Sequence, residues 1–261
     1  MKHIKDLKIV ITAGGSGIGC EMAAALSGAG AKVIVCDKNK DLLRSFSKKY
    51  SNIDAHHVDV SIETQVQSFF KDIGDKYQNI DALVNNAGIS GPSAKLEDIS
   101  FNDWKRTLDV NLDGVFLSAK YAIPLMKRGG GSIVNMGSTS SFLGTPLRSA
   151  YSASKWGLIG LTKTWAMEYG KNKIRVNAIC PSSVNGDRIE NVIKKEAKYR
   201  NSSPEKIKSA YLKQTSLNSF IDVEEVVGML VYLLSPLAKK ITGQMLVIDG
   251  HTESLAMIDR D

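Results

Sequence analysis

Residues 7–26 of this 261-residue chain read Leu-Lys-Ile-Val-Ile-Thr-Ala-Gly-Gly-Ser-Gly-Ile-Gly-Cys-Glu-Met-Ala-Ala-Ala-Leu, and they carry its strongest fold signal. The first six residues are mostly apolar or β-branched, which predicts a short buried parallel strand. The glycine-rich segment 13–19 predicts a turn, and segment 20–26 predicts a helix. A glycine turn between a strand and a helix lets backbone N–H groups approach a phosphate at the positive end of the helix. The stretch therefore indicates nucleotide binding.

Strand patterns recur along the rest of the chain and alternate with helical patterns. We expect further strands at residues 30–37, 53–60, 80–88, 132–136, 174–181 and 244–250, and helices at 38–50, 61–77, 104–128, 150–169 and 223–234. This alternation predicts an α/β protein with one parallel sheet that helices cover on both faces.

Polar or turn-forming residues follow most of these strands. They are the glycine turn at 13–19, Asp37, Asp59, Asn86, Ser138 and Pro181. Parallel strands present their carboxyl ends at one edge of the sheet, and ligands of such folds bind beyond that edge. We therefore expect these residues to lie around one ligand site.

Asp37 ends the second predicted strand, about twenty residues beyond the glycine turn. A carboxylate there can accept hydrogen bonds from both hydroxyls of an adenine ribose, and it repels a 2′-phosphate. This position favours NAD over NADP, although the basic residue Lys38 follows it. The alternative is an N-cap for helix 38–50, and one residue can do both. Asp59 and Val60, after the third strand, could contact the adenine.

Tyr151 and Lys155 are four residues apart on a predicted helix, so their side chains share one face within ~6 Å at the Cβ atoms. An ammonium beside a phenol favours the phenolate and lowers the tyrosine pKa from ~10. Such a tyrosine can exchange a proton with an alcohol or a carbonyl near neutral pH. A solvated surface pair is the alternative interpretation. Ser138 places a hydroxyl at the end of the preceding strand.

The length suits one large α/β domain, and we expect residues 1–261 to form it. The chain is 43% hydrophobic and 23% charged, near the globular average, which argues against disorder. No apolar run approaches the ~20 residues that cross a bilayer, so we expect no membrane span. The N-terminus lacks a signal-peptide pattern. Three scattered cysteines fit free thiols in a reducing cytoplasm.

The net charge of +7 is spread over most predicted helices. Solvated helix faces explain it better than nucleic-acid binding, because no nucleic-acid module accompanies the charge. His56 and His57 are adjacent on a strand and point to opposite faces, so we expect no metal site there.

Two local features depart from this regular pattern. Segment 182–220 is too long for a tight connection, and we expect it to form a helical lid over the strand ends. Asn111 lies inside helix 104–128 and close to a glycine, which is locally unfavourable. Either a functional kink or a tolerated cost would explain Asn111.

Over essentially its whole length, the sequence resembles the short-chain dehydrogenase/reductase family. The matching residues are Thr12 with the glycine turn, Asp59-Val60, Asn85-Asn86-Ala87-Gly88, Asn111, Ser138, Tyr151-Ser152-Ala153-Ser154-Lys155 and Pro181. The resemblance implies a Rossmann-type sheet of seven strands in the order 3-2-1-4-5-6-7. It also implies nicotinamide-dependent interconversion of an alcohol and a ketone, by a homotetramer or a dimer.

The resemblance assigns a role to each of four residues. Tyr151 would be the general acid/base, and Lys155 would bind the nicotinamide ribose and lower the tyrosine pKa. Ser138 would hydrogen-bond the substrate oxygen. Asn111 would hold a water that links Lys155 to solvent.

The resemblance also implies which residues contact the cofactor. These are Gly14, Ser16, Gly17, Ile18, Asp37, Asp59, Val60, Asn86, Tyr151, Lys155 and Val184.

Two positions depart from the family pattern. Ala13 replaces the first glycine of the turn, which is tolerated if its φ stays negative, and Ser182 replaces a glycine after Pro181.

The substrate is expected to be a small polar secondary alcohol, such as a sugar, a polyol or a hydroxy acid, oxidised with NAD. Ser140 and Arg188 are candidate substrate contacts, although Arg188 could instead pair with Glu190 within the lid. One alternative is an NADPH-dependent 3-oxoacyl-carrier reductase, against which Asp37 argues. Another alternative is a catalytically silent nucleotide-binding regulatory protein. The presence of all four catalytic candidates (Asn111, Ser138, Tyr151 and Lys155) argues against it.

Overall fold

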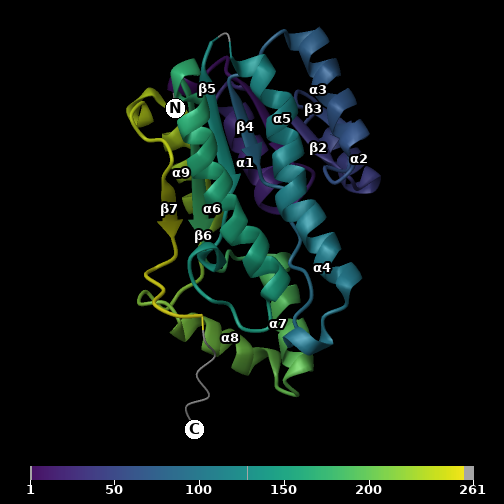
Figure 1. The fold of residues 1–261 in the computed structure, drawn as a ribbon, viewed down its shortest axis with the longest axis vertical. Helices are drawn as coiled ribbons and strands as arrows, with labels where there is room; N and C mark the ends of the chain where they lie inside the picture. The colour runs from purple at the N-terminus through teal and green to yellow at the C-terminus, as the bar shows by residue number, and fades with distance from the viewer. Residues whose placement is uncertain (1, 128, 256–261) are drawn as a thin grey trace.

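The computed structural model describes residues 2–127 and 129–255, and a seven-stranded parallel sheet forms its centre (Figure 1). The strands are β1 (Lys8–Thr12), β2 (Lys32–Asp37), β3 (Asp54–His57), β4 (Ala82–Asn85), β5 (Gly131–Met136), β6 (Ile174–Pro181) and β7 (Met245–Ile248). Their order is β3-β2-β1-β4-β5-β6-β7, and every neighbouring pair is parallel. The predicted fold class and strand order are confirmed.

Helices cover both faces of the sheet (Figure 1). One face packs against α3 (Glu63–Tyr77), α5 (Gly114–Met126) and α6 (Ser149–Tyr169), and the other against α1 (Gly17–Gly28), α2 (Lys40–Lys49) and α9 (Val223–Leu234). Each helical layer forms a separate hydrophobic core with the face of the sheet that it covers. A parallel sheet needs both cores, because both of its faces are apolar.

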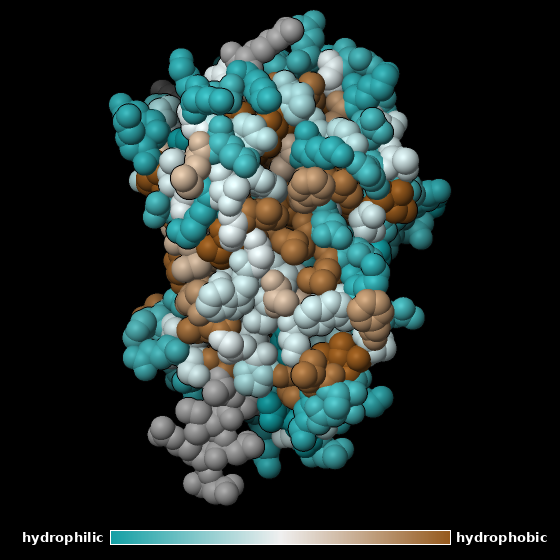
Figure 2. Space-filling model, viewed as in Figure 1, coloured by the Kyte–Doolittle hydropathy of each residue, from teal (hydrophilic) through white to brown (hydrophobic). Residues whose placement is uncertain are grey.

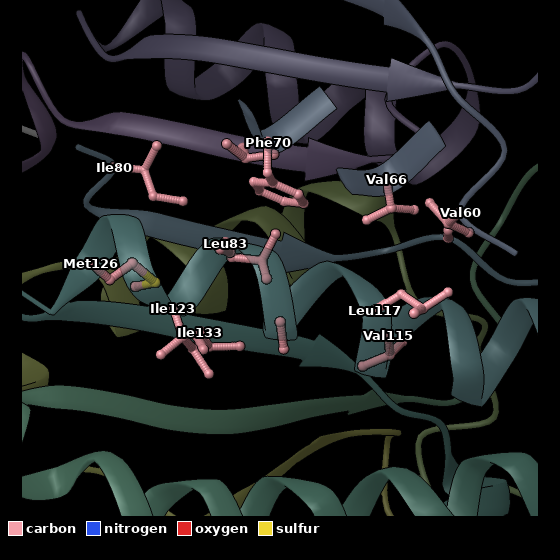
Figure 3. Packing of buried hydrophobic residues seen from close by; sticks show 14 of the residues in the cluster. Val60, Val66, Phe70, Ile80, Leu83, Val115, Leu117, Ile123, Met126 and Ile133 are labelled. Atoms are coloured by element: carbon pink, nitrogen blue, oxygen red, sulfur yellow. The ribbon is translucent and has the colours of Figure 1, made fainter. Parts of the chain in front are cut away.

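The core beneath α3 and α5 joins residues that are distant in the sequence (Figure 3). Leu83 of β4 and Ile133 of β5 belong to one cluster with Phe70 of α3 and with Ile123 and Met126 of α5. Each is at least 95% buried, and each such side chain stabilises the fold by about 1.5–3 kcal/mol. This packing fixes β4 and β5, whose carboxyl ends carry two of the site's loops.

The helix predicted at 104–128 is helical from Phe101 to Met126, and its hydrogen-bond pattern changes around Asn111, as the kink interpretation of Asn111 predicts. The structure has α4 (Phe101–Leu108), a π-helix at Asp109–Asp113, and then α5, with residue 128 outside the described residues. The amide of Gly114 donates to the carbonyl of Asp109, the five-residue step that defines a π-helix. A Cβ on Gly114 would lie 2.8 Å from Val60 Cγ2, so glycine allows this close approach. The π-helix brings the buried Asn111 side chain against Ile89.

Two helices occupy segment 182–220, where we expected a helical lid. They are α7 (Asp187–Tyr199) and α8 (Pro204–Lys213), and they lie beyond the carboxyl ends of the strands (Figure 1). Ser203 caps α8 by accepting from Lys206 N. A small separate core that includes Ile193, Ile207 and Phe220 holds the two helices together.

Ala13 has a φ of +53°, so the negative φ that would make its methyl group harmless is not adopted. A left-handed backbone costs a non-glycine residue about 1–2 kcal/mol. Part of a gain from glycine is lost because glycine is more flexible in the unfolded chain. We expect Ala13→Gly to raise the free energy of unfolding by about 0.5–1 kcal/mol.

Chemical denaturation would measure this change. Ala24→Gly, within α1, serves as the control and should lower the free energy of unfolding by about 0.5–1 kcal/mol. Equal destabilisation by both substitutions would show that Ala13 carries no strain.

Candidate active site

The glycine turn leads from β1 into α1 and leaves open space at its tip. Gly17 has a φ of +54° and no heavy atom within 4 Å of a Cβ built on it. At Gly19 a Cβ would lie 2.2 Å from the carbonyl oxygen of Ala13, so a glycine is needed for the helix to approach the strand. This cradle at a helix N-terminus fits the pyrophosphate of a dinucleotide.

Asn86 ties the end of β4 to this turn. Its Nδ2 donates to the carbonyl oxygens of Thr12 and Ala13, each at 3.1 Å. The Thr12 hydroxyl accepts from the backbone N–H groups of Asn86 and Ala87. The first β-strand and the fourth are thereby locked together where the cofactor is expected.

Asp37 ends β2 beside the glycine turn and is almost fully buried. Its carboxylate accepts from the N–H groups of Gly15 and Asn39. The alternative prediction of an N-cap is wrong, because Asn39 caps α2 by accepting from Asp41 N and Leu42 N. Asp37 is thus held by backbone N–H groups at the strand end, and it is not among the residues that line the main cleft.

Three other predicted cofactor contacts face protein neighbours. The carboxylate of Asp59 accepts from Ser61 and from Arg106. Val60 is buried against Gly114, and a Cβ on Gly14 would clash with Val35 at 2.6 Å. None of the three is among the residues that line the cleft at the strand ends.

A cleft of about 500 Å³ opens at the carboxyl edge of the sheet. The predicted residues that line it are Ser16, Gly17, Ile18, Asn86, Ser138, Ser140, Tyr151, Lys155, Val184 and Arg188. Segments from five parts of the chain thus meet at one site. Thr145, Arg148 and Tyr211 also line the cleft, although none of them was predicted as an individual site residue.

Tyr151, Lys155 and Ser138 lie together within the cleft. Lys155 Nζ is 5.7 Å from the centroid of the Tyr151 ring, and it donates to the carbonyl oxygen of Met136 at 2.6 Å. Ser138, at the end of β5, is close enough to Tyr151 for its side chain to lower the tyrosine pKa. The Ser138 hydroxyl oxygen accepts from Ser140 N, which fixes its orientation.

The surroundings of Tyr151 favour its phenolate. Burial raises the pKa of Tyr151, but the positive charges of Lys155, Arg188 and Arg148, with the Ser138 side chain, lower it to about 8. Burial and the charge of Arg188 lower the pKa of Lys155, while the nearby phenol opposes this shift. A phenol with a pKa of about 8 can donate and accept protons near neutral pH.

Asn111 is fully buried behind Lys155, and its side chain is used within the protein. Its Oδ1 accepts from Ile89 N at 2.7 Å, and its Nδ2 donates to the Ile89 carbonyl and to Ser154 Oγ. A Cβ on Gly88 would lie within 4 Å of both Asn111 Oδ1 and Lys155 Nζ. The π-helix thus positions Asn111 next to the tyrosine–lysine helix.

The two predicted substrate contacts both line the cleft. Ser140 is buried, and its hydroxyl accepts from Thr145 Oγ1 at 2.8 Å. Arg188 of α7 reaches across to donate to the carbonyl oxygen of Gly88 at 2.9 Å. The alternative pairing of Arg188 with Glu190 is wrong, because Glu190 pairs with Lys208.

The sheet order, the glycine turn and the cleft at the strand ends define a Rossmann-type α/β protein. Residues 12–251 match the family model described as enoyl-(acyl carrier protein) reductase. The chain belongs to the short-chain dehydrogenase/reductase family.

Two curated relatives illustrate the similarity. The chain is 35% identical over 246 residues to a 3-oxoacyl-[acyl-carrier-protein] reductase of Thermotoga maritima, covering 92% of this chain and 95% of the relative. It is 34% identical over 249 residues to a D-beta-hydroxybutyrate dehydrogenase of Rhizobium meliloti, covering 92% and 96%. The matches span nearly the whole of each protein, so the comparison includes the site.

A solved structure of NAD+-bound xylitol dehydrogenase superimposes with a TM-score of 0.91. The two sequences are 28% identical, and the match covers 96% of this chain and 100% of the xylitol dehydrogenase chain. The crystal structure of a levodione reductase gives a TM-score of 0.89 at 29% identity, covering 94% and 97%.

Two further observations concern the described part of the chain. No helix in it is long and apolar enough to cross a membrane. Within residues 2–127 and 129–255, no group of three or more histidine, cysteine or acidic residues is arranged to hold a metal ion.

Proposed function

We propose that this protein is an NAD-dependent oxidoreductase that interconverts a small polar secondary alcohol and its ketone. The observation that carries the proposal is the Tyr151 phenol, whose pKa of about 8 results from the cations around it in the cleft. The hydroxyl of Ser138 and the ammonium of Lys155 lie beside the phenol, and the glycine turn opens onto the same cleft.

Proton transfer is the chemistry proposed for these side chains. In alcohol oxidation, the Tyr151 phenolate takes the proton of the substrate hydroxyl, and Ser138 holds the same oxygen by a hydrogen bond. The positive charge of Lys155 stabilises the phenolate, and Asn111 supports the proton route from Lys155 to solvent. When NAD is bound, it supplies the acceptor for the hydride of the carbinol carbon. Ketone reduction is the reverse, with Tyr151 donating its proton.

The NAD preference rests on Asp37. Its buried carboxylate at the end of β2 is held by two backbone N–H groups and would repel the 2′-phosphate of NADP. The glycine turn, with Ser16, Gly17 and Ile18 facing the cleft, would hold the pyrophosphate. Asn86 and Val184, which also line the cleft, would border the nicotinamide half.

The helices α7 and α8 are proposed to act as a lid over the substrate. They carry Arg188 and Tyr211 into the cleft and have a small core of their own. A separate core lets the two helices move as a unit relative to the sheet. Closure of such an element excludes water from the proton-transfer site.

We also propose a homotetramer, with a dimer as the simpler alternative. Apolar side chains gather in the middle of the face in Figure 2. Phe116 of α5 is 47% exposed, and Trp156 and Met167 of α6 are 51% and 86% exposed. Burying these side chains against a second copy would remove them from water. Light scattering should give four, or two, times the mass of one chain.

The three cysteines are free thiols, in keeping with the cytoplasmic location that we propose.

A second candidate is an NADPH-dependent reductase of 3-oxoacyl groups on a carrier protein. The 35% identity to the Thermotoga maritima reductase favours it. Asp37 argues against it, because NADPH carries the 2′-phosphate. The relatives named above are oxidoreductases, which gives no support to a silent regulatory protein.

A rate comparison separates these functions. NAD+ and NADP+ would each be tested with a panel of secondary alcohols, sugars and hydroxy acids, and NADPH with a carrier-linked 3-oxoacyl group. We expect NAD+ to support the faster alcohol oxidation. A higher rate with NADPH and the carrier-linked substrate would favour the second candidate, and no turnover of any of these would favour the silent protein.

The pH dependence of alcohol oxidation should report the Tyr151 pKa. Only the phenolate can accept the proton, so kcat/KM should rise about tenfold per pH unit below 8 and level off above it. For ketone reduction the phenol is the active form, so kcat/KM should fall above about pH 8. Initial rates across the pH range in both directions measure these limbs. A flat profile between pH 6 and 9 in both directions would contradict the assignment.

A further inference from the structure

Arg148 is a buried cation without a carboxylate partner. It precedes α6, is 7% exposed and lines the cleft. Its Nη2 donates to the carbonyl oxygen of Ser90 at 2.9 Å, whereas its Nε is buried with no hydrogen-bond partner. In the part of the chain that the structure describes, no carboxylate lies within ion-pair distance of it. Burying an unpaired charge is costly, so this arrangement points to a ligand that supplies the missing charge.

The acidic residues of the cleft do not fill this role. Glu21 and Asp187 line the same cleft, but neither forms an ion pair with Arg148. Glu196, on α7, is engaged by Arg200 and by the Tyr211 hydroxyl. Arg188, which also lines the cleft, adds positive charge near Tyr151. The cleft near Tyr151 is therefore positively charged.

Arg148 also lies close to the reacting atoms. Its Cζ is 4.8 Å from the centroid of the Tyr151 ring, over the ring face. The substrate hydroxyl must come within hydrogen-bond distance of the Tyr151 oxygen, about 2.6–3.2 Å. A group bound by Arg148 is therefore only a few bonds from the carbinol carbon of the same small molecule.

We propose that Arg148 binds the carboxylate of the substrate, which makes the substrate a short hydroxy acid and its product the oxo acid. This inference rests on the proposed function and narrows its substrate class. A guanidinium presents two parallel N–H groups that match the two oxygens of a carboxylate. The carboxylate would neutralise Arg148 and orient the carbinol toward Tyr151 and Ser138. Sugars and polyols lack this charge and would leave Arg148 unpaired.

The test compares a charged and a neutral substrate that share one carbon skeleton. 3-Hydroxybutyrate and 3-hydroxybutyramide would be oxidised with NAD+ by the wild type, Arg148→Gln and Arg148→Lys. Arg148 also lowers the Tyr151 pKa, so each rate is taken on the pH plateau of its own variant. Arg44→Gln, on the exposed face of α2, is the control for loss of an arginine elsewhere.

We expect the wild type to prefer the acid. Arg148→Gln should lower kcat/KM for the acid by about 10²- to 10³-fold, chiefly through KM, and change that for the amide less than threefold. Arg148→Lys should restore part of the loss, because it keeps the charge but not the planar fork. The retained amide activity would also show that Arg148→Gln is folded.

Three results would overturn the proposal. The first is an equal loss on acid and amide with Arg148→Gln, which would give Arg148 a structural role. The second is a wild type that oxidises polyols or the amide faster than any hydroxy acid, which would leave the proposed function intact. The third is a preference for glycerol 3-phosphate, a secondary alcohol with a phosphate. By contrast, no NAD+ reduction with any alcohol would contradict the proposed function itself.

Discussion

Replacing Tyr151 by phenylalanine should lower the rate of alcohol oxidation by about 10³- to 10⁴-fold while leaving the fold unchanged. The substitution removes only the hydroxyl that exchanges the proton, and the ring keeps its contacts with Arg148 and Lys155. The initial rate of NADH formation measures the loss. Circular dichroism and the affinity for NAD measure the integrity of the fold and of the cofactor site.

A matched control comes from a tyrosine outside the cleft. Tyr232 on α9 is 39% exposed, and Tyr232→Phe should retain the wild-type rate. A Tyr151→Phe protein with more than a tenth of the wild-type rate would mean that another group transfers the proton.

Replacing Lys155 by methionine should have the second largest effect. Lys155 is the strongest of the charges that lower the Tyr151 pKa, and burial acts in the opposite direction. Without the ammonium, the pKa should return to about 10 or higher, which lowers the phenolate fraction at pH 7 about 100-fold. The pH profile of kcat/KM measures this change as a shift of its rising limb to higher pH.

Lys163→Met provides the comparison, because Lys163 lies two turns further along α6 and is exposed. Its pH profile should match the wild type. If Lys155→Met also left the rising limb near pH 8, the tyrosine pKa would not depend on the ammonium.

Patterns in the sequence predicted much of the fold and several residues of the site. Alternating strands and helices predicted the parallel sheet, while the resemblance to the family supplied its order. The four-residue spacing of Tyr151 and Lys155 predicted their proximity, because helix geometry alone sets it. Residues at strand ends, such as Asn86 and Ser138, were predicted to share an edge because parallel strands end at the same edge of a sheet.

Features that depend on tertiary contacts were not predictable in this way. The π-helix at Asp109–Asp113 depends on how closely Gly114 approaches Val60. Asn39, and not Asp37, caps the N-terminus of α2, and the Asp37 carboxylate instead accepts a hydrogen bond from Gly15 N in the glycine turn. Arg148 reads in the sequence as one of many basic residues, and only the folded chain shows that it is buried without an acidic partner.

The central claim is that Tyr151 ionises near neutral pH in the free protein, and a spectrophotometric titration tests it most directly. Phenolate absorbance would be followed against pH for the wild type and for Tyr151→Phe, without cofactor or substrate. The difference between the two titrations should show one tyrosine ionising with a pKa of about 8. A difference curve that rises only at pH 10 or above would contradict the account.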